Sequence, residues 1–369
     1  MAKFTCPYCY GTHTLNDCGM RCSYNVAGTD ITCKKGLPKS EDGWIPQIYK
    51  KQCLSCKDAR KRIYCPIVEK EIPTEFLSGE SLPIALIGAK ASGKSNYIGV
   101  LIDEIKRKMA RTFNTTLSVS CDETSKRYYD QFYKEPLYSY GEVVAATDAG
   151  EIPPMIFPLR FMDKKDRITH SATLTFYDTA GENLDNETSI DICNRYIPNS
   201  KGIILLVDPL QIPGVRKQLE GRMPLPNLNS DVTDVLSRVV ESIRAVKNIK
   251  SGCINIPLAL AFTKLDALEQ YDILPEDSIL REHSRHVDIG AFSVSEFDAC
   301  HKEMCDILEN WFDADLLQLV KNFSKYAYFG VSALGSVPVN NTVTEIKPKR
   351  VLDPLLWLLA ENKYIKKVK

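Results

Sequence analysis

The segment at positions 84–95 combines a run of apolar residues with a glycine-rich turn that ends in Gly-Lys-Ser. This pattern predicts a phosphate-binding loop, in which a buried strand turns sharply into a helix and aims backbone N–H groups at an anion. Gly88 and Gly93 allow the turn and let the backbone approach a phosphate closely. Lys94 can reach β- and γ-phosphates, and the Ser95 hydroxyl can ligate Mg²⁺. The predicted nucleotide-binding residues of this loop are Gly88, Ala91, Ser92, Gly93, Lys94, Ser95 and Asn96.

A second motif, Asp-Thr-Ala-Gly-Glu at positions 178–182, follows the apolar segment 172–177. An acidic residue at the carboxyl end of a strand beside a phosphate loop can hold Mg²⁺ through water, so Asp178 is a predicted metal ligand. The glycine three residues later lets a backbone N–H meet a γ-phosphate. Gly181 is therefore a predicted nucleotide contact.

Recognition of the base is predicted for two further segments, Thr-Lys-Leu-Asp at 263–266 and Ser-Ala-Leu at 332–334. The Asp266 carboxylate can accept two N–H donors from the edge of guanine, and the stem of Lys264 can lie over the ring. Adenine lacks this pair of donors, so an acidic residue here selects guanine. The alternative role of Asp266 is that of a helix N-cap. The predicted base-binding residues are Thr263, Lys264, Asp266, Ser332, Ala333 and Leu334.

Eight of the thirteen cysteines precede residue 66, and this density indicates a metal-binding domain. Clustered cysteines in a reducing compartment are more often zinc ligands than disulfides. Two thiolates separated by two residues suit one tetrahedral ion, so one structural zinc is expected and a second could form. The predicted zinc ligands, whose pairing the sequence leaves open, are Cys6, Cys9, Cys18, Cys22, Cys33, Cys53, Cys56 and Cys65.

Cys65-Pro66-Ile67-Val68 resembles a zinc knuckle whose second cysteine is replaced by Val68. Cys65 would then need a partner such as Cys18 or Cys33, and His13 could replace one ligand. The segment contains too few apolar residues to build a core unaided, so the metal is expected to supply folding energy. Its lysines and arginines could contact nucleic acid, although their charge alone favours a solvated surface.

The elements that must position these residues alternate between strands and helices. Strands are predicted at 84–87, 155–161, 172–177, 202–208, 257–262 and 326–331. Helices are predicted at 95–110, 122–133, 231–246, 293–323 and 351–365. The pattern predicts an α/β fold with a mostly parallel sheet flanked by helices. We expect a cysteine-rich zinc domain at 1–72, a linker at 73–81 and a nucleotide-binding domain at 82–369, with insertions near 112–153 and 209–229.

Composition and charge set few further limits. The 369 residues, 44% hydrophobic and 25% charged, suit a large globular domain with a small one. Lys plus Arg equals Asp plus Glu at 47 each, so the net charge indicates neither a nucleic-acid nor a membrane partner. The N-terminus lacks an apolar signal segment, and the apolar run at 203–207 is too short to span a bilayer. A cytoplasmic location is expected.

The four motifs together, in this order and at strand ends, resemble the Ras-like GTPase domain of the TRAFAC class. More narrowly, the chain resembles the bacterial double-GTPase family, in which a cysteine-knuckle domain precedes the GTPase domain. The matching stretches are 6–9, 88–95, 176–182, 202–211 and 350–359. The resemblance implies a Ras-like fold, GTP or GDP, Mg²⁺ and Zn²⁺ as ligands, and a place in bacterial conflict systems directed at phage.

Three positions depart from the Ras-like pattern. Thr263 stands where most such domains have Asn, which is expected to weaken a contact that tethers the phosphate loop. Glu182 stands where Ras-like proteins have a water-orienting Gln; it can accept a proton or orient water but cannot donate a hydrogen bond to the phosphate. The switch threonine that contacts Mg²⁺ has no clear motif, and Thr147 is favoured over Thr112. Lys94, Glu182 and Thr147 form the predicted catalytic set.

The expected function is a GTP-binding switch that hydrolyses GTP slowly. No arginine finger is evident in the chain, so a protein partner or a second copy is expected to complete the site. One alternative is an interaction module or scaffold that binds nucleotide with little turnover and docks protein or nucleic acid through its zinc domain. Another is a nucleic-acid binder gated by nucleotide. An ATPase is least favoured, because Asp266 would then have no purpose.

Overall fold

The computed structural model describes residues 3–9, 11–14, 17–22, 61–72, 80–89, 92–119, 122–133, 137–144, 155–176, 196–223, 225–228, 232–311 and 314–369. The chain divides into two compact units, Met1–Ser81 and Leu82–Lys369. Each unit has its own sheets. Within the described ranges, no helix is both long and apolar enough to cross a membrane.

The first unit contains two small antiparallel sheets. Strand β1 (Lys3–Thr5) pairs with β2 (Thr12–Thr14). Strand β4 (Lys61–Tyr64) pairs with β3 (Gly19–Cys22) on one side and with β5 (Glu71–Ile72) on the other. The turns between β1 and β2 and between β4 and β5 both contain cysteines, so each hairpin presents a thiol at its end.

The first unit buries little apolar surface in the part that the structure describes. Apart from its cysteines, the buried apolar side chains there are Phe4, Pro7, Tyr64 and Ile72. Such a small core rarely stabilises a domain without a metal or disulfides. The described cysteines of this unit with placed side chains, Cys6, Cys9, Cys18 and Cys65, are all reduced.

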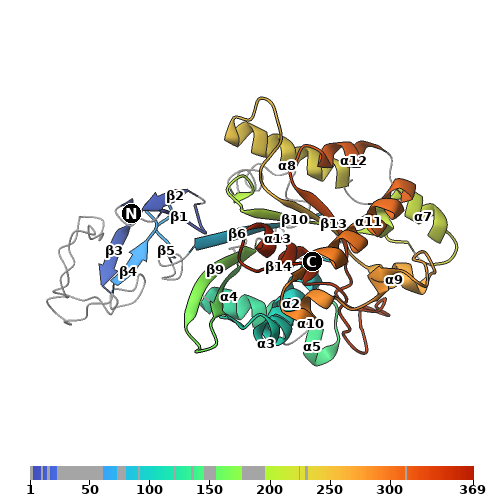
Figure 1. Ribbon diagram of the computed structural model, residues 1–369, viewed down its shortest axis with the longest axis horizontal. Helices are drawn as coiled ribbons and strands as arrows, with labels where there is room; N and C mark the ends of the chain where they lie inside the picture. The colour runs from blue at the N-terminus through green and yellow to red at the C-terminus, as the bar shows by residue number, and fades with distance from the viewer. Residues whose placement is uncertain are drawn as a thin grey trace. The chain divides into compact units, whose positions relative to one another are not determined.

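The second unit is built on a seven-stranded sheet with the order β13-β11-β10-β6-β9-β8-β7 (Figure 1). The strands are β6 (Glu80–Gly88), β7 (Thr115–Leu117), β8 (Met155–Met162), β9 (Ile168–Phe176), β10 (Gly202–Val207), β11 (Leu258–Phe262) and β13 (Tyr326–Gly330). Strands β6, β10, β11 and β13 run parallel, whereas β7, β8 and β9 form an antiparallel meander at one side. Parallel neighbours need crossover connections, which here contain the helices.

The parallel strands are apolar on both faces. One face carries, in register, Leu86, Ile204, Ala259 and Ala327. The other face carries, one residue further along, Ile87, Leu205, Leu260 and Tyr328. All these side chains are buried, as expected for parallel strands that helices cover on both sides.

Helices cover both faces of this sheet. Helices α2 (Lys94–Glu104) and α13 (Asp353–Glu361) share one apolar core with Leu86 and Ile204. Figure 1 shows α8 (Val232–Lys247) and α12 (Ala314–Val320) together on the opposite side of the sheet from α2. The other α-helices and strands that the structure describes in this unit are α3 (Ala110–Thr112), α4 (Asp122–Lys126), α5 (Leu137–Tyr140), α7 (Pro213–Leu219), α9 (Leu265–Gln270), α10 (Arg285–Ile289), α11 (Val294–Trp311), β12 (Phe292–Ser293) and β14 (Lys367–Val368).

The expected α/β fold, with a mostly parallel sheet flanked by helices and preceded by a small cysteine-rich unit, is confirmed. The helix predicted at 95–110 differs from the structure, because regular α-helix ends at Glu104 and residues Ile105–Met109 are π-helical. The proline-rich stretch 209–229 is partly helical, since Pro213 stands at the start of α7, where a missing N–H costs nothing.

A buried ionic network fixes the start of α13. Nη1 of Arg350 lies 2.9 Å from Oδ2 of Asp353, and its Nη2 lies 3.1 Å from Oε1 of Glu296 on α11. The three side chains are at most 5% exposed. The next residue, Val351, accepts a hydrogen bond of 3.0 Å from the hydroxyl of Tyr97 on α2. The helix that follows the phosphate loop is thus joined to the C-terminal helix through one short segment.

Candidate functional site

The carboxyl ends of the four parallel strands form one edge of the sheet. Strands β6, β10, β11 and β13 end at Gly88, Val207, Phe262 and Gly330, and a predicted functional segment directly follows three of them. Ligands of open α/β sheets bind at this edge. The phosphate loop, the 263–266 segment and the 332–334 segment are therefore brought together, although they are far apart in the sequence.

Two glycines shape the phosphate loop for steric reasons. A Cβ atom at Gly88 would lie 2.4 Å from Oγ of Ser92 and 3.2 Å from the Cβ of Leu206, so no larger residue fits there. Gly93 is the N-cap of α2 and has a φ of 81°, which favours glycine. No atom of the described residues lies within 4 Å of the Cβ position at Gly93, so among them the space beside the first turn of α2 is open.

The hydroxyl of Ser92 is a buried polar group in this loop. Ser92 is 1% exposed, and its Oγ has no hydrogen-bond partner among the described residues. A buried hydroxyl without a partner costs free energy, and a phosphate oxygen would supply an acceptor. With the open space beside Gly93 and the buried Lys94 and Asn96, the loop fits an anion at the N-terminus of α2.

Thr263 contacts the phosphate loop directly. Its Oγ1 lies 3.0 Å from the carbonyl oxygen of Ser92 and 3.2 Å from that of Val207, and the residue is buried. We expected the Thr in place of Asn to weaken the tether, yet the shorter side chain spans from the end of β11 to the loop after β6. The segment 263–266 and the loop after β6 are thereby held at a fixed distance.

Lys264 forms an ion pair with Asp208, a residue that the sequence did not single out. Nζ of Lys264 lies 2.6 Å from Oδ2 of Asp208, whose side chain is 1% exposed. Asp208 follows β10, and its Oδ1 also accepts a hydrogen bond of 3.0 Å from the N–H of Leu210. The pair fixes the ammonium group and so the path of the lysine stem. An acidic residue at the end of an all-apolar strand was the signal that could have identified it.

Asp266 and Ser332 are in contact. Oγ of Ser332 donates a hydrogen bond of 2.5 Å to Oδ1 of Asp266 and accepts one of 2.9 Å from the N–H of Gly335. Burial raises the pKa of the Asp266 carboxyl above its usual range. The alternative role of Asp266 as an N-cap is not observed, because Lys264 precedes α9 as its N-cap residue. Ala333 and Leu334 pack, partly buried, against the core.

Several predicted site residues are outside the described part of the chain. They are Ala91, Thr147, Asp178, Gly181 and Glu182 of the nucleotide site and Cys33, Cys53 and Cys56 of the first unit. Lys94 and Ser95 begin α2, as predicted for the end of a phosphate loop. Asn96 lies in the first turn of α2, and its Oδ1 accepts a hydrogen bond of 3.0 Å from the backbone N–H of Val144; its contact with a nucleotide stays a prediction.

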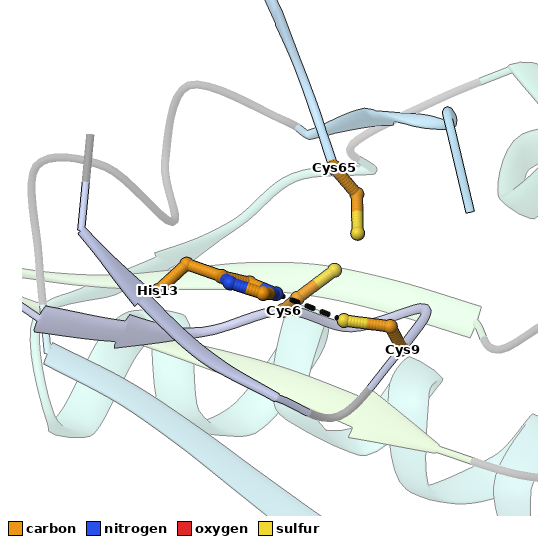
Figure 2. Close-up of side chains that lie close together, drawn as sticks. All are labelled: Cys6, Cys9, His13 and Cys65. Carbon is orange, nitrogen blue, oxygen red and sulfur yellow. Dashed lines mark hydrogen bonds between the residues drawn. The ribbon is translucent and has the colours of Figure 1, made fainter. Parts of the chain in front are cut away.

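Four side chains of the first unit converge on one point, as Figure 2 shows. Cys6, Cys9, His13 and Cys65 are buried, and their ligand atoms all lie within 4.8 Å of one another. In a tetrahedral zinc site with ligand distances near 2.3 Å, ligand atoms lie about 3.8 Å apart. Three sulfurs and one imidazole nitrogen are a donor set that zinc accepts, so the cluster fits the predicted structural zinc.

Both cysteine turns have the same local geometry. The N–H of Tyr8 lies 3.4 Å from Sγ of Cys6, and the N–H of Ile67 lies 3.4 Å from Sγ of Cys65. A backbone N–H aimed at a sulfur stabilises its thiolate form. The turn at Cys65 therefore has knuckle geometry despite Val68.

His13 supplies the fourth donor in place of a second cysteine of the Cys65 turn. It lies on β2, and its Nε2 is 3.0 Å from Sγ of Cys9. Cys18 lies outside the cluster, and its Sγ donates to the carbonyl oxygen of Thr14 at 3.5 Å. Burial raises the pKa of Cys18 to about 11, whereas hydrogen bonds with Cys6 and Cys9 lower the pKa of Cys65 to about 2. For Cys22 the structure describes only the backbone, on β3.

The comparisons with known proteins give distant likenesses. No protein-family model matches the chain. A protein of Mycolicibacterium smegmatis named putative ESX-1 scaffolding and assembly protein SaeC is 24% identical over 321 residues, which are 80% of this chain and 79% of that protein. This identity is too low to define a family.

Solved structures of GTPases are also similar. The small GTPase Arl6 (BBS3) from Trypanosoma brucei with a bound nucleotide analogue has 13% identity and a TM-score of 0.33, covering 78% of this chain and 99% of that chain. The signal recognition particle receptor SRb-GTP/SRX complex from Chaetomium thermophilum has 13% identity and a TM-score of 0.32, and the match covers 70% of this chain and 93% of that chain. The GTP-bound GTPase-like domain of Ski7 from S. cerevisiae has 14% identity and a TM-score of 0.34, and the match covers 77% of this chain and 50% of that chain. TM-scores this low do not assign a function.

The metal cluster leads to a test by substitution. Cys65→Ser removes the sulfur of the second turn, so we expect the zinc content of the purified protein to fall by about one ion per chain. The first unit should also become sensitive to protease, because binding energy of the metal is folding energy. Zinc is measured by mass spectrometry of the metal. Cys253→Ser, which changes an exposed thiol of the second unit, is the control. Unchanged zinc in Cys65→Ser would contradict the assignment.

Proposed function

We propose that this protein is a guanine-nucleotide switch that binds GTP and GDP with Mg²⁺ and hydrolyses GTP slowly. The observation that carries the proposal is the link across one edge of the sheet. Thr263 hydrogen-bonds to Ser92 in the phosphate loop, and three residues further on Asp266 is held by Ser332. A site for phosphates and a site for a base are thus joined at a short, fixed separation.

The phosphate end of the proposed site is the loop 88–95. The N–H groups at the start of α2 and the Lys94 ammonium would neutralise phosphate charge, and the Ser92 hydroxyl would gain its missing partner. Ser95, and Asp178 through water, would hold the magnesium. When bound, Mg²⁺ neutralises the charge that develops on the transferring phosphoryl group.

The base end of the proposed site is formed by Lys264, Asp266 and the 332–334 loop. The Asp266 carboxylate would accept the two N–H donors of guanine, while the Ser332 hydroxyl holds it in place. The ion pair with Asp208 keeps the Lys264 stem extended beside the base. Backbone N–H groups of the 332–334 loop would donate to the guanine oxygen.

Hydrolysis is assigned to residues outside the described part of the chain. In the proposal, Glu182 orients the attacking water, Gly181 contacts the γ-phosphate and Thr147 contacts Mg²⁺. A protein partner, or a second copy of the chain, would supply the missing positive charge. Residues 82–369 would form the GTPase domain and residues 1–72 the zinc domain. The resemblance to the double-GTPase family supports a role in bacterial defence against phage.

A second candidate function is a scaffold that binds guanine nucleotide with little turnover. The name of the M. smegmatis relative, a scaffolding and assembly protein, favours it. The zinc unit would then be the docking surface for a protein partner. Measurement of turnover separates the two candidates, because both require nucleotide binding and only the switch requires hydrolysis.

Substitution of Asp266 tests the identity of the base. Asp266→Asn replaces one acceptor by a donor, so affinity for GDP should fall by about 10- to 100-fold, as for the loss of a hydrogen bond to a charged group. Affinity for xanthosine diphosphate should rise, because its 2-oxo group accepts from the new amide. Titration calorimetry with both nucleotides measures the exchange. Asp234→Asn, at an exposed position on α8, should change neither affinity. Equal affinities in Asp266→Asn and wild type would contradict the base assignment.

Substitution of Lys94 tests hydrolysis. Lys94→Ala removes the charge closest to the transferred phosphate, so single-turnover GTP hydrolysis should slow by roughly 100-fold. Lys217→Ala, which changes an exposed lysine on α7, is the matched control. If wild type binds GTP but hydrolyses it no faster than Lys94→Ala, the scaffold replaces the enzyme as the better explanation.

A further inference from the structure

Two segments that are distant in the sequence pair beside the nucleotide site. The N–H of Val143 donates to the carbonyl oxygen of Asn341 at 2.9 Å, and the N–H of Val343 donates to that of Gly141 at 2.7 Å. Glu142 and Thr342 form the antiparallel bridge between them. Residues 141–143 and 341–343 thus make a short two-stranded ribbon.

One side of the ribbon belongs to the excursion 335–348, which we call the arm. The arm leaves directly after the 332–334 segment and is closed at its base by backbone hydrogen bonds. Ser332 and Lys349 exchange two bonds, of 3.0 and 2.9 Å, and the N–H of Lys347 donates to the carbonyl oxygen of Leu334 at 2.9 Å. Lys349 is also paired with Glu269 on α9. The arm is therefore anchored to the elements that carry Asp266 and Ser332.

The other side of the ribbon is fixed at a second point. The N–H of Val144 donates to Oδ1 of Asn96 at 3.0 Å, and Asn96 is 9% exposed. Asn96 directly follows Ser95 in the first turn of α2. The chain from 141 to 144 is thus held by the arm and by the phosphate end of the site, and it leaves residue 144 beside the start of α2.

We propose that the arm and Asn96 act together as a positioning element for the triphosphate state. They hold residues 141–144 beside the start of α2, at the phosphate end of the proposed site, before GTP arrives, and Thr147 follows three positions later in the sequence. Fixing these residues in advance lowers the entropic cost of contacts that only the triphosphate makes. The inference rests on the proposed function and adds two positioning features to it, Asn96 and the ribbon.

Gly141 offers a way to open the ribbon without touching the nucleotide. Its φ is 66°, and a Cβ atom there would lie 2.2 Å from the carbonyl oxygen of Val343. Gly141→Ala must therefore push the two segments apart. Gly221→Ala is a matched control, because Gly221 has a φ of 74° but no atom of the described part of the chain within 4 Å of its Cβ position. Val144→Pro removes the N–H that donates to Asn96 and leaves Asn96 itself unchanged.

The experiment measures affinities for GDP and for a non-hydrolysable GTP analogue with Mg²⁺ in the four proteins. Both Gly141→Ala and Val144→Pro should weaken binding of the GTP analogue by about threefold to tenfold, the effect of one hydrogen bond, while GDP binding stays near the wild-type value. Gly221→Ala should leave both affinities unchanged. Hydrogen exchange of the amides at 143 and 343, measured without nucleotide, verifies that the ribbon has opened.

The outcomes separate the inference from the function on which it rests. An unchanged ratio of GTP-analogue to GDP affinity, in variants whose ribbon amides exchange freely, overturns the inference and leaves the switch intact. Equal weakening of both nucleotides overturns it as well, because a merely structural role predicts that result. If Gly141→Ala does not fold, Val144→Pro decides by the same ratio. Absence of guanine-nucleotide binding by wild type overturns the proposed function and the inference with it.

Discussion

The parallel pairing of β6, β10, β11 and β13 is the constraint on which the rest of the structure depends. Because the four strands run in one direction, every loop that leaves a carboxyl end emerges at the same edge. Ser92 and Thr263 meet there although 171 positions separate them. The loops at this edge are joined by the Thr263–Ser92 hydrogen bond, the Lys264–Asp208 ion pair and the Ser332–Asp266 hydrogen bond. The apolar sheet thus places the polar groups, and the polar groups set the spacing of the proposed nucleotide site.

The two units depend on different forces. The second unit has a continuous apolar core of sheet and helices, reinforced by the buried Arg350 network at α13. The first unit has few buried apolar side chains in its described part and a cluster of three thiols and one imidazole instead. Without a cation, thiolates this close repel one another. We therefore infer that folding of the first unit depends on metal, whereas the second unit is stabilised by its own apolar core.

Local signals in the sequence predicted strands of the second unit and the position of the segments 88–95, 263–266 and 332–334 at strand ends, because each depends on neighbours along the chain. What the sequence could not supply were contacts between distant residues. Asp208 and Lys264 are 56 positions apart, and His13 joins Cys65 only because two separate hairpins end at one point. The pairing of 141–143 with 341–343 and the π-helical turn after Glu104 have no periodic pattern that identifies them.

The central claim is that the carboxyl edge of this sheet binds a guanine nucleotide. Its most direct test is identification of the nucleotide released from the natively purified protein, by chromatography and mass spectrometry, with the protein quantified in the same sample. We expect GDP or GTP in near-stoichiometric amount, lost on treatment with a magnesium chelator and regained when guanine nucleotide is added back. Release of an adenine nucleotide, or failure of added GDP and GTP to bind the nucleotide-free protein, would contradict the claim.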